Sequence, residues 1–572
     1  MDVIATAGHV DHGKSTLIVA LTGRDPDRFA EEKRRGLTID LGFAWTVLPS
    51  GSELGFVDVP GHERFIGNML AGVGGVRSAL LVVAADEGWM PQTEEHHEVL
   101  RLLEVERGIV AITKTDLVEP DRCAAVQSQI AERAARRWPI VEVSARTGAG
   151  LAELRAALDR LQASVPPDAG TRPRLWVDRS FTVRGAGTVV TGTLQGGSLQ
   201  VDEEVDVMGD RRLRARVRTI QTHERARDVA VAGSRVALNL VGVDHRNVRR
   251  GDAVCLGSQW WMSDCVDARV TVTAGARLDA RGAYLLYLGT AVVPARIRSL
   301  PAHGMARLRL SRPLPIAVGD RFVVRDTGRG RVVAGGAVLD VDPAGPIDPG
   351  RLRRREAAAP ERELLDVLLA ERDFVPTADA EALAPGGSTR AERAGAFLTA
   401  PETLDRLGQA ATDAVARHHD EHPSEPGVPV ARLGRTLQVP DGALGAVLAR
   451  TELVSDGETV HAPGRRAPTD ALEGTLAASG LAPPPAAELD ASARLLRALV
   501  RDGVLVMAGP FAYRRADFDE AVRIVRARID ADGPQTTSAL RAALGITRKH
   551  ALPLLEEMDR RGVTRRRGDG RE

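Results

Sequence analysis

The feature that most limits the fold of this chain is a glycine-rich segment near its beginning, residues 8–15, which reads GHVDHGKS. It fits the pattern G-x-x-x-x-G-K-[ST], follows the apolar run 3–7 and leads into a helical stretch. In this pattern backbone N–H groups surround phosphates, the lysine reaches the β- and γ-phosphates, and the next hydroxyl ligates Mg²⁺. The segment therefore predicts an α/β domain with a nucleotide site formed by Gly8, His9, Val10, Asp11, His12, Gly13, Lys14, Ser15 and Thr16.

The composition of the basic residues supports this interpretation. The chain has 77 Lys plus Arg, and only four of them are lysines, at positions 14, 33, 114 and 549. Since arginine is otherwise the default cation, each of these positions is expected to need a compact ammonium group. Lys14 is the lysine of the glycine-rich segment.

Three more motifs follow the ends of apolar runs, in the order typical of a GTPase. Runs at 54–58, 79–85, 108–113 and 140–143 alternate with helical stretches, which predicts a parallel sheet covered by helices over residues 1–168. Asp58 is placed to hold the Mg²⁺ shell through water, and the amide of Gly61 can bind a γ-phosphate. Thr113 begins the second set of nucleotide-binding residues, in which Asp116 would accept from guanine, Lys114 would pack along the base, and Ser144 and Ala145 would contact the guanine O6. ATP specificity is the alternative, although an ATPase has no use for this base-reading set.

In the rest of the chain the pattern of apolar residues changes twice, which indicates further domains. Short runs rich in Val, Leu and Thr between glycines predict two β-barrels, at 169–260 and 261–345. The remainder repeats a helix and a short hairpin every ~50–60 residues, which predicts tandem winged helices at 346–406, 407–464, 465–514 and 515–572. A generic α-helical domain is the alternative for this half. The expected fold is thus multidomain, with an α/β P-loop GTPase domain, two β-barrels and tandem winged-helix domains.

Charge and cysteine content narrow the partners and the compartment. The 77 basic and 77 acidic residues give no net charge, so no general attraction to a polyanion is expected. Residues 356–510 hold 14 basic and 24 acidic residues, a net of −10, whereas residues 541–572 hold 9 and 5, a net of +4. Three cysteines without a C-x-x-C pair argue against disulfides and zinc, and the apolar run 79–85 is too short for a bilayer. We expect a cytoplasmic protein with no membrane partner.

The basic C-terminal segment is expected to be a module with a core of its own. An apolar helix face recurs there at steps of three and four residues, formed by Phe518, Val522, Val525 and Ile529. Thr547 fits a helix N-cap, and Pro553 six residues later has no physical explanation at this stage. The first helical turn and the following wing would bind RNA through Arg548, Lys549, His550, Arg565, Arg566 and Arg567. A solvated charge run is the alternative.

Residues 8–15, 35–39 (RGLTI) and 58–62 (DVPGH) resemble the translational GTPases related to elongation factor Tu. The resemblance implies that Thr38 ligates Mg²⁺ together with Ser15 and Asp58 when GTP is bound. It implies that His62 positions the attacking water, that Val10 and Leu37 form an apolar gate beside it, and that Asp11 helps to hold charge near the phosphates. Thr113 departs from the pattern, because most GTPases have Asn there, and this puts the bracing of the phosphate loop in doubt.

The whole chain resembles the bacterial selenocysteine-specific elongation factors, most clearly at residues 177–192, 547–555 and 562–569. The resemblance implies an amino-acid pocket lined by Asp178, Arg179 and Arg235. A selenol is much more acidic than a thiol, whose reference pKa is ~8.5, so selenocysteine enters as an anion while serine stays neutral. Arginines aimed at one anion would discriminate by charge, with Asp178 orienting Arg179. The alternative is that both arginines are ordinary surface residues of an arginine-rich chain.

The expected function follows from this resemblance. A GTPase stimulated by the ribosome, using GTP/GDP and Mg²⁺, would deliver selenocysteinyl-tRNA at UGA codons marked by an mRNA hairpin (SECIS). Its partners would be selenocysteinyl-tRNA, the mRNA hairpin and the ribosome, and it would act as a monomer. Two alternatives stay open, a translational GTPase for another tRNA and a GTP-sensing winged-helix regulator that binds nucleic acid.

Overall fold

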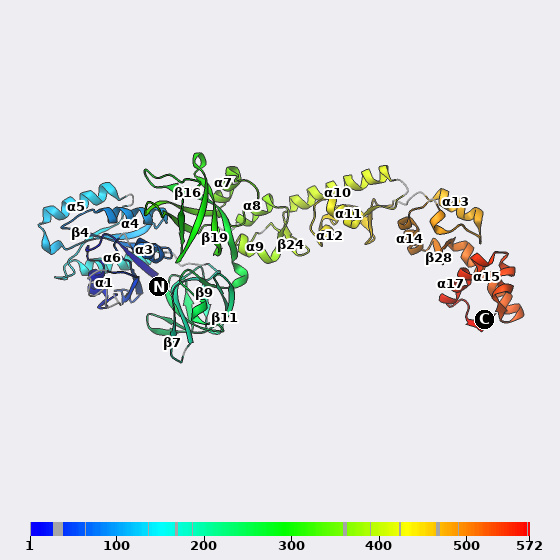
Figure 1. The fold of residues 1–572 in the computed structure, drawn as a ribbon, viewed down its shortest axis with the longest axis horizontal. Helices are drawn as coiled ribbons and strands as arrows, with labels where there is room; N and C mark the ends of the chain where they lie inside the picture. The colour runs from blue at the N-terminus through cyan, green and yellow to red at the C-terminus, as the bar shows by residue number, and fades with distance from the viewer. Residues whose placement is uncertain are drawn as a thin grey trace. The chain divides into compact units, whose positions relative to one another are not determined.

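The computed structural model of the chain (Figure 1) describes residues 2–26, 38–62, 65–134, 137–165, 170–185, 187–358, 363–388, 390–422, 425–464, 469–489, 491–568 and 570–572. It has two compact units, Met1–Leu368 with Thr377–Thr389, and Leu369–Pro376 with Arg390–Glu572. The expected domain end at 168 lies outside the described residues, as does Leu37 of the expected apolar gate.

The first unit begins with a six-stranded sheet in the order β2-β3-β1-β4-β5-β6. Neighbouring strands are parallel except β2, which pairs antiparallel with β3 at one edge. The strands are β1 (Asp2–Ala7), β2 (Gly42–Val47), β3 (Glu53–Asp58), β4 (Ser78–Ala84), β5 (Arg107–Thr113) and β6 (Ile140–Glu142). The apolar runs thus predicted five strands correctly. They missed β2, an edge strand in which buried and half-buried residues alternate, although its sequence GFAWTV is largely apolar.

Helices cover both faces of this sheet because alternate residues of its inner strands are apolar on both sides. Helices α1 (Lys14–Thr22) and α6 (Leu151–Ser164) pack on one face. The other face carries α3 (Ile66–Val73), α4 (Pro91–Leu102) and α5 (Pro120–Arg133), and its core also includes Tyr287, Val323 and Val332 from a later domain. The first domain therefore shares apolar packing with the barrel that supplies these residues.

Two closed six-stranded barrels follow, as the sequence predicted. The first closes in the order β10-β15-β7-β8-β14-β11 and encloses its own apolar core. Its strands are β7 (Arg174–Val183), β8 (Gly187–Gln195), β10 (Glu204–Met208), β11 (Arg212–Thr222), β14 (Arg235–Val241) and β15 (Ala253–Cys255), with β9 (Ser198–Gln200), β12 (Arg225–Arg227) and β13 (Val229–Val231) at its margins.

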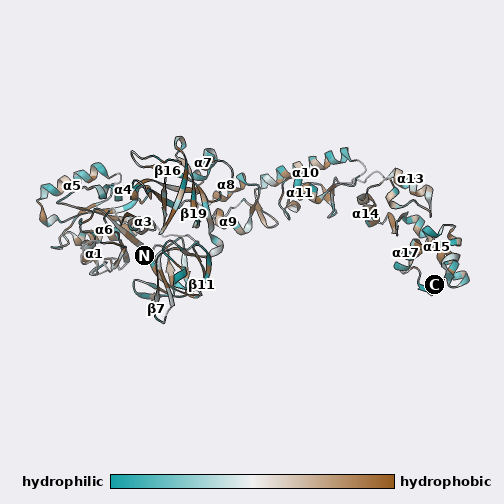
Figure 2. Cartoon of the chain, in the orientation of Figure 1, coloured by the Kyte–Doolittle hydropathy of each residue, from teal (hydrophilic) through white to brown (hydrophobic). Residues whose placement is uncertain are grey.

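The second barrel closes in the order β16-β19-β18-β17-β20-β21. Its strands are β16 (Trp261–Val272), β17 (Tyr284–Leu288), β18 (Ala291–Leu300), β19 (Met305–Ile316), β20 (Arg321–Asp326) and β21 (Arg331–Asp340). Figure 2 shows hydrophobic colour along the strands of both barrels. The exposed side chains alternate with buried ones along β18, as a barrel wall requires.

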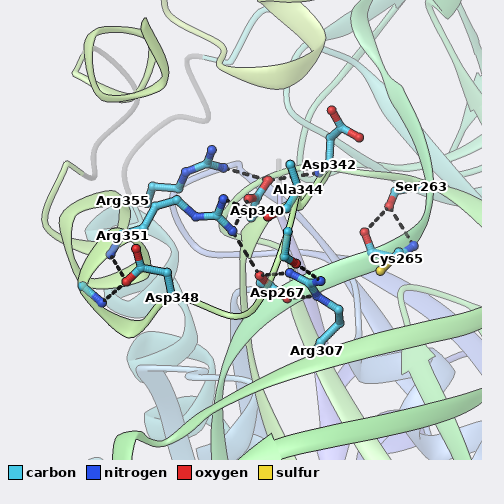
Figure 3. A network of polar contacts seen from close by, with 12 residues as sticks. Ser263, Cys265, Asp267, Arg307, Asp340, Asp342, Ala344, Asp348, Arg351 and Arg355 are labelled. Atoms are coloured by element: carbon cyan, nitrogen blue, oxygen red, sulfur yellow. Dashed lines mark hydrogen bonds and ion pairs between the residues drawn. The ribbon is translucent and has the colours of Figure 1, made fainter. Parts of the chain in front are cut away.

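Helix α7 (Pro349–Ala357) is held against the second barrel by a buried ionic network (Figure 3). Asp267 of β16 accepts two bonds from Arg307, at 2.7 and 2.8 Å, and one from Arg351 of α7 at 3.3 Å. Arg355, also on α7, lies 2.8 Å from the buried carboxylate of Asp340. Moving the helix away would leave the buried carboxylates without these arginines, which is costly for a buried charge. The network therefore fixes the helix to the barrel.

The second unit is a series of short helices and small sheets, which is the winged-helix architecture predicted for this half. Three three-stranded sheets and the hairpin β28-β29 are present among the described residues. The strands are β22 (Val375–Pro376), β23 (Glu392–Ala394), β24 (Phe397–Thr399), β25 (Val428–Pro429), β26 (Val454–Ser455), β27 (Thr459–His461), β28 (Leu505–Ala508), β29 (Phe511–Arg514), β30 (Gln535–Thr536), β31 (Arg566–Arg567) and β32 (Gly570–Arg571).

The helices between these strands are mostly short. Helix α9 (Thr377–Leu383) and residues 364–368 of α8 (Leu364–Glu371) belong to the first unit. The others belong to the second unit and are α10 (Pro401–Glu421), α11 (Val430–Thr436), α12 (Leu444–Leu448), α13 (Asp470–Ser479), α14 (Ala493–Arg501), α15 (Arg515–Asp532), α16 (Thr537–Leu544) and α17 (Arg548–Arg560). The expected boundary between residues 406 and 407 falls inside α10, because this helix is continuous over 21 residues.

The C-terminal module has the apolar core that the sequence predicted, but this core begins before the expected boundary. Phe518 and Val525 of α15 do line an apolar cluster, as the periodicity predicted. The same cluster includes Val506, Phe511 and Tyr513 of the hairpin β28-β29, which lies before the expected boundary at 514/515. The hairpin is therefore part of the core of the C-terminal module.

Candidate functional site

The glycine-rich segment forms a tight loop between β1 and α1, at the carboxyl end of the parallel strands. Gly8 has a φ of +134°, and a Cβ atom there would lie 2.2 Å from the carbonyl oxygen of Val82. The ammonium group of Lys14 is buried inside the loop and donates to the carbonyls of Gly8 and His9 at 3.1 and 2.7 Å. Burial lowers the pKa of Lys14 to about 8, and the charges of Asp58 and Asp11 oppose this shift.

Three oxygen atoms converge beside this loop. The Ser15 hydroxyl lies 2.6 Å from a carboxylate oxygen of Asp58 and 3.0 Å from the Thr38 hydroxyl. The second oxygen of Asp58 accepts a bond of 2.7 Å from Thr6, which holds the buried carboxylate in place. Mg²⁺ is bound in proteins by few carboxylates and by hydroxyl, phosphate and water oxygens, so this set fits Mg²⁺. No group of three or more His, Cys, Asp or Glu suited to a metal exists among the described residues.

The departure at Thr113 has a structural answer. Its hydroxyl donates to the carbonyl of His12 at 2.7 Å, so Thr113 braces the phosphate loop directly. The doubt raised by the missing Asn therefore does not hold for this chain. The side chain of His12 is buried and contacts the carbonyl of Val82 at 3.2 Å, and burial lowers its pKa to about 4. Only the backbone of His12 is left to face a phosphate.

The expected base-reading residues gather at one end of the same sheet edge. Ser144 donates to Asp116 at 2.6 Å, and Arg146 donates to its other oxygen at 2.7 Å. The bond from Ser144 lowers the pKa of Asp116, which keeps this carboxylate charged. Lys114 has a φ of +58° and its ammonium group lies 3.1 Å from Asp86. Ala145 follows Ser144 in the loop before α6.

Gly61 packs directly on the phosphate loop. A Cβ atom at this position would lie 2.4 Å from the Lys14 ammonium nitrogen and 2.7 Å from the backbone nitrogen of Val10. Only glycine fits such a close approach. His62 is the next residue, with its ring centroid 6.0 Å from that of Phe65. The chain therefore places His62 directly after the glycine that packs on the phosphate loop.

Two residues that contact the phosphate loop were missed from the sequence. On α4, His96 accepts a bond from the Gly8 amide at 3.0 Å, and Gln92 one turn earlier accepts from the Val10 amide at 3.1 Å. Burial lowers the pKa of His96 to about 3, so this imidazole is neutral and can accept. The spacing of four residues on a helix that begins with Pro91 was the available signal.

The three expected pocket residues come together between the first barrel and strand β2. Asp178 is buried and accepts from both Arg235 and Thr191, while the Arg235 guanidinium lies 3.2 Å from the ring centroid of Phe43. Burial alone would raise the pKa of Asp178, but the charge and bonds of Arg235 outweigh it and hold the pKa below its usual value. We expected Asp178 to orient Arg179, and the bidentate partner is instead Arg235.

Arg179 is held by the first domain. It donates to the carbonyl of Leu41 and lies 3.9 Å from the carboxylate of Asp40. Its guanidinium is 4.9 Å from the Phe43 ring centroid. The arginines thus share one aromatic ring from β2, and the cavity that this ring lines has a volume of about 20 Å³, room for roughly one water molecule.

The expected RNA-binding residues divide into two groups. Arg548, Lys549, Arg565, Arg566 and Arg567 are exposed. His550 is buried, with Nε2 3.0 Å from the Pro483 carbonyl and its ring 4.5 Å from that of Phe511, so its placement among the RNA-binding residues was wrong. A histidine in the first turn of a helix faces either solvent or the core, and the spacing alone does not distinguish the two.

Helix α17 shows how its N-cap residue and its internal proline are used. Thr547 occupies the N-cap position but makes no side-chain cap bond, because its hydroxyl is 3.0 Å from Nδ1 of His550. Pro553 lies inside the helix and packs on the turn of the hairpin β28-β29, where a Cβ atom on Gly509 would lie 2.9 Å from the Pro553 Cβ. The proline therefore contributes a contact between two elements at the cost of one helix bond.

Four family models match successive parts of the chain. They are described as "Elongation factor Tu GTP binding domain" for residues 1–164, "Elongation factor Tu domain 2" for 187–255, "Selenocysteine-specific elongation factor, beta-barrel domain" for 265–345 and "Elongation factor SelB, winged helix" for 527–572.

Full-length relatives agree with these matches. The chain is 33% identical to the selenocysteine-specific elongation factor of Desulfomicrobium baculatum over 100% of its own length and 99% of the relative. It is 34% identical to that of Escherichia coli K12, over 99% and 98% of the two chains. Among solved structures, it is similar to a bacterial selenocysteine-specific elongation factor with a TM-score of 0.77 and 27% identity, covering 100% and 99% of the two chains.

A further solved structure is similar to part of the chain. Elongation factor SelB from Methanococcus maripaludis, in complex with the GTP analogue GppNHp, is 25% identical with a TM-score of 0.53, covering 60% of this chain and 79% of its own.

The fold and the nucleotide site define a translational GTPase of the elongation factor Tu class, which binds GTP and GDP and hydrolyses GTP. Within this class, the chain belongs to the selenocysteine-specific elongation factors. None of its described helices is long and apolar enough to cross a membrane.

Proposed function

We propose that this GTPase delivers selenocysteinyl-tRNA to the ribosome at UGA codons marked by an mRNA hairpin, and that the ribosome stimulates its GTP hydrolysis. The observation that carries the proposal is the pair of arginines on Phe43, since they form a cationic pocket beside the nucleotide site of the same unit. Such a factor would act in the cytoplasm. It would act as a monomer, because each of its partners would bind a different part of one chain.

The nucleotide would be bound by two sets of residues. Backbone N–H groups of residues 8–16, with Lys14 and the Gly61 amide, are suited to the phosphates. Asp116 and Ser144, with Thr113, Lys114 and Ala145 beside them, are suited to guanine, because a charged carboxylate accepts from the guanine N1 and N2 donors. Ser15, Thr38 and Asp58 would hold Mg²⁺, Asp58 through water, and the ion when bound would neutralise charge on the β- and γ-phosphates.

His62 is proposed as the catalytic residue that orients the attacking water. Gly61 touches the phosphate loop at Lys14, so the next side chain is within reach of a γ-phosphate bound there. Asp11 and Val10 would support this end of the site through charge and packing. In nucleotide hydrolysis the protein contributes chiefly position and electrostatic stabilisation, which one well-placed imidazole can supply to a water.

The pocket would select selenocysteine by charge. Three arginines, Arg179, Arg235 and Arg250, face two carboxylates, Asp178 and Asp40, so the group keeps a positive excess that favours an anion. A neutral serine hydroxyl cannot use this excess. Serine therefore forms no charge-assisted bond with these guanidinium groups, and a site built for one charge binds its uncharged analogue more weakly.

The exposed basic residues of the C-terminal module would bind the mRNA hairpin. Arg548 and Lys549 begin a helix, and Arg565, Arg566 and Arg567 form the strand and turn beside its end. Helix starts and basic wings suit phosphates, whereas sequence is read from unstacked bases. His550 and the buried Arg571 support this surface from inside and are not proposed to touch RNA.

A filter-binding comparison tests the proposal. With a GTP analogue present, the chain should bind selenocysteinyl-tRNA far more tightly than seryl-tRNA or bulk aminoacyl-tRNA. Equal affinity for all three would indicate a translational GTPase for another tRNA, and no tRNA binding would indicate a GTP-sensing regulator. The variants Arg179→Ala and Arg235→Ala should weaken selenocysteinyl-tRNA by about 1.5–3 kcal/mol more than seryl-tRNA.

A further inference from the structure

One short segment of the first domain touches both the oxygen cluster at the nucleotide and the arginine pair of the pocket. Its first described residue, Thr38, lies 3.0 Å from the Ser15 hydroxyl. Its last, Phe43, carries the guanidinium groups of Arg235 and Arg179 on one ring. Since only five peptide bonds separate these ends, a displacement of one end is transmitted to the other within a few residues.

Between these ends, Asp40 is shared by two arginines of the first barrel. One carboxylate oxygen accepts from Arg250 at 3.2 Å, and the other lies 3.9 Å from Arg179. Arg179 also donates to the carbonyl of the neighbouring residue, Leu41. A pocket arginine is therefore positioned by the nucleotide-binding domain, whereas its companion Arg235 is positioned by Asp178 of the barrel itself.

Helix α3 holds the same segment from the other side. Asn68 donates to the carbonyl of Ile39 at 2.8 Å and accepts from Arg250 at 3.1 Å. This helix begins four residues after His62, so it follows the loop that carries Gly61. Asp40, Asn68 and Arg250 thus form one polar cluster that includes both the segment after Thr38 and the helix after Gly61.

We propose that Asp40 is a positioning residue for amino-acid selection, and that it orients Arg179 toward the amino-acid side chain only while Thr38 is held at the nucleotide. The inference rests on the proposed function of the pocket. Arg235 stays in place in either nucleotide state, because its carboxylate partner is on the same barrel. Arg179 moves with residues 38–41. The preference for an anionic side chain then depends on GTP through one of the two arginines.

An orienting role of Asp40 and a role in holding the two domains together predict different effects on tRNA binding. If Asp40 only held the barrel and the first domain together, the loss of its charge would weaken the binding of every aminoacyl-tRNA to the same degree. If it orients Arg179, the loss falls on the anionic amino acid alone, because serine makes no charged contact for Arg179 to lose. The ratio of the two affinities therefore separates the roles.

The experiment uses the full chain with Asp40→Asn, which keeps the shape and removes the charge. Affinities for selenocysteinyl-tRNA and seryl-tRNA are measured with a GTP analogue and with GDP. We expect the selenocysteinyl-to-seryl ratio of the variant to fall by about tenfold or more with the GTP analogue, toward the ratio seen with GDP, while affinity for the nucleotides is unchanged. Because both tRNAs are measured in one preparation, an inactive fraction cancels from the ratio.

Glu53→Gln is the matched control. Glu53 is also a carboxylate of the first domain that holds arginines of the same barrel, Arg225 at 2.9 Å and Arg227 at 3.2 Å, and it contacts neither pocket arginine. It should leave the ratio at the wild-type value. A wild-type ratio in Asp40→Asn, or an equal loss for both tRNAs, would overturn the inference. A wild-type chain that does not distinguish the two tRNAs would instead overturn the proposed function.

Discussion

The pair of Asp178 and Arg235 allows a quantitative test of the pocket that needs no tRNA. The Asp178 side chain is 6% exposed and is bonded by Arg235 and Thr191. Replacing Arg235 with Ala leaves a carboxylate buried without its main partner, and breaking a buried pair in this way typically costs about 3–5 kcal/mol. We expect about 3 kcal/mol, the low end, because the Thr191 hydroxyl and the charge of Arg179 are retained.

Hydrogen exchange of the amides in β7, β8 and β14 measures this loss locally, which suits a multidomain chain that does not unfold in two states. A change of about 3 kcal/mol corresponds to a loss of protection on the order of 100-fold. The double variant Arg235→Ala with Asp178→Asn removes the buried charge and should recover most of the protection. Unchanged protection in the single variant, or no recovery in the double variant, would refute the reasoning.

The pH dependence of the same variants supplies an independent check. In the intact chain the pKa of Asp178 lies below its usual value. The pair therefore stabilises the fold fully at pH values above the pKa of the unfolded chain, and this stabilisation is lost as pH falls through the pKa of the folded chain. In Arg235→Ala, burial acts without its main opposing charge and raises the pKa of Asp178. The destabilisation of the variant should therefore shrink as pH is lowered, because a protonated carboxyl group tolerates burial.

Three further predictions concern the other parts of the site. His62→Ala should leave GTP and GDP affinity unchanged and slow ribosome-stimulated hydrolysis by about a thousandfold or more; a rate within about tenfold of wild type would exclude the proposed role. Thr113→Ala removes the 2.7 Å bond to the His12 carbonyl and should weaken GTP and GDP alike by about 1 kcal/mol, whereas Thr113→Ser should bind both normally in a fluorescent-nucleotide titration. Arg565→Ala, Arg566→Ala or Arg567→Ala should weaken all RNAs and reduce the salt slope by about 0.7–0.9 per lost phosphate contact, and Lys549→Ala should affect the cognate hairpin more than a scrambled one. His550→Ala is the control, since this buried ring should change stability and leave the salt slope of a folded sample unaltered.

The sequence predicted the parts of this molecule in which local pattern and tertiary role coincide. A phosphate loop needs glycine, lysine and a hydroxyl at fixed spacing, so residues 8–15 were sufficient to predict the loop and its helix. Strands β1, β3, β4 and β5 are buried on both faces, and their sequences are apolar runs. Edge strand β2 was not predicted, although it supplies Phe43, the ring on which both pocket arginines lie.

Tertiary partners account for what the sequence could not predict. The pairing of Asp178 with Arg235 joins residues 57 positions apart on β7 and β14, and sequence neighbours suggested Arg179 instead. Likewise, the hydroxyl of Thr113 replaces an expected Asn because it lies against the His12 carbonyl, a distance set by the sheet. In both places the residue types indicated the chemistry, and only the fold determined which atoms meet.

The hairpin β28-β29 leads to a last prediction about how the C-terminal modules can be separated. One set of its residues, Val506 and Phe511 among them, belongs to the core with α15 and α17, whereas Leu505 and Ala512 belong to the core with α13 and α14. A hairpin buried on both faces cannot lose one covering layer without exposing apolar surface.

Deleting residues 518–572 should therefore abolish binding of the mRNA hairpin. It should also destabilise the module before the cut, because Val506, Phe511 and Tyr513 lose their covering helices. Deleting residues 469–572 removes both cores together and should leave GTP and tRNA binding intact with no new exposed apolar surface. Limited proteolysis compares the 518–572 deletion with the full chain, and rapid cleavage near β28-β29 is expected only in the truncated chain. If residues 469–517 stay as resistant as in the full chain, the two modules have independent cores and the shared hairpin is not what stabilises them.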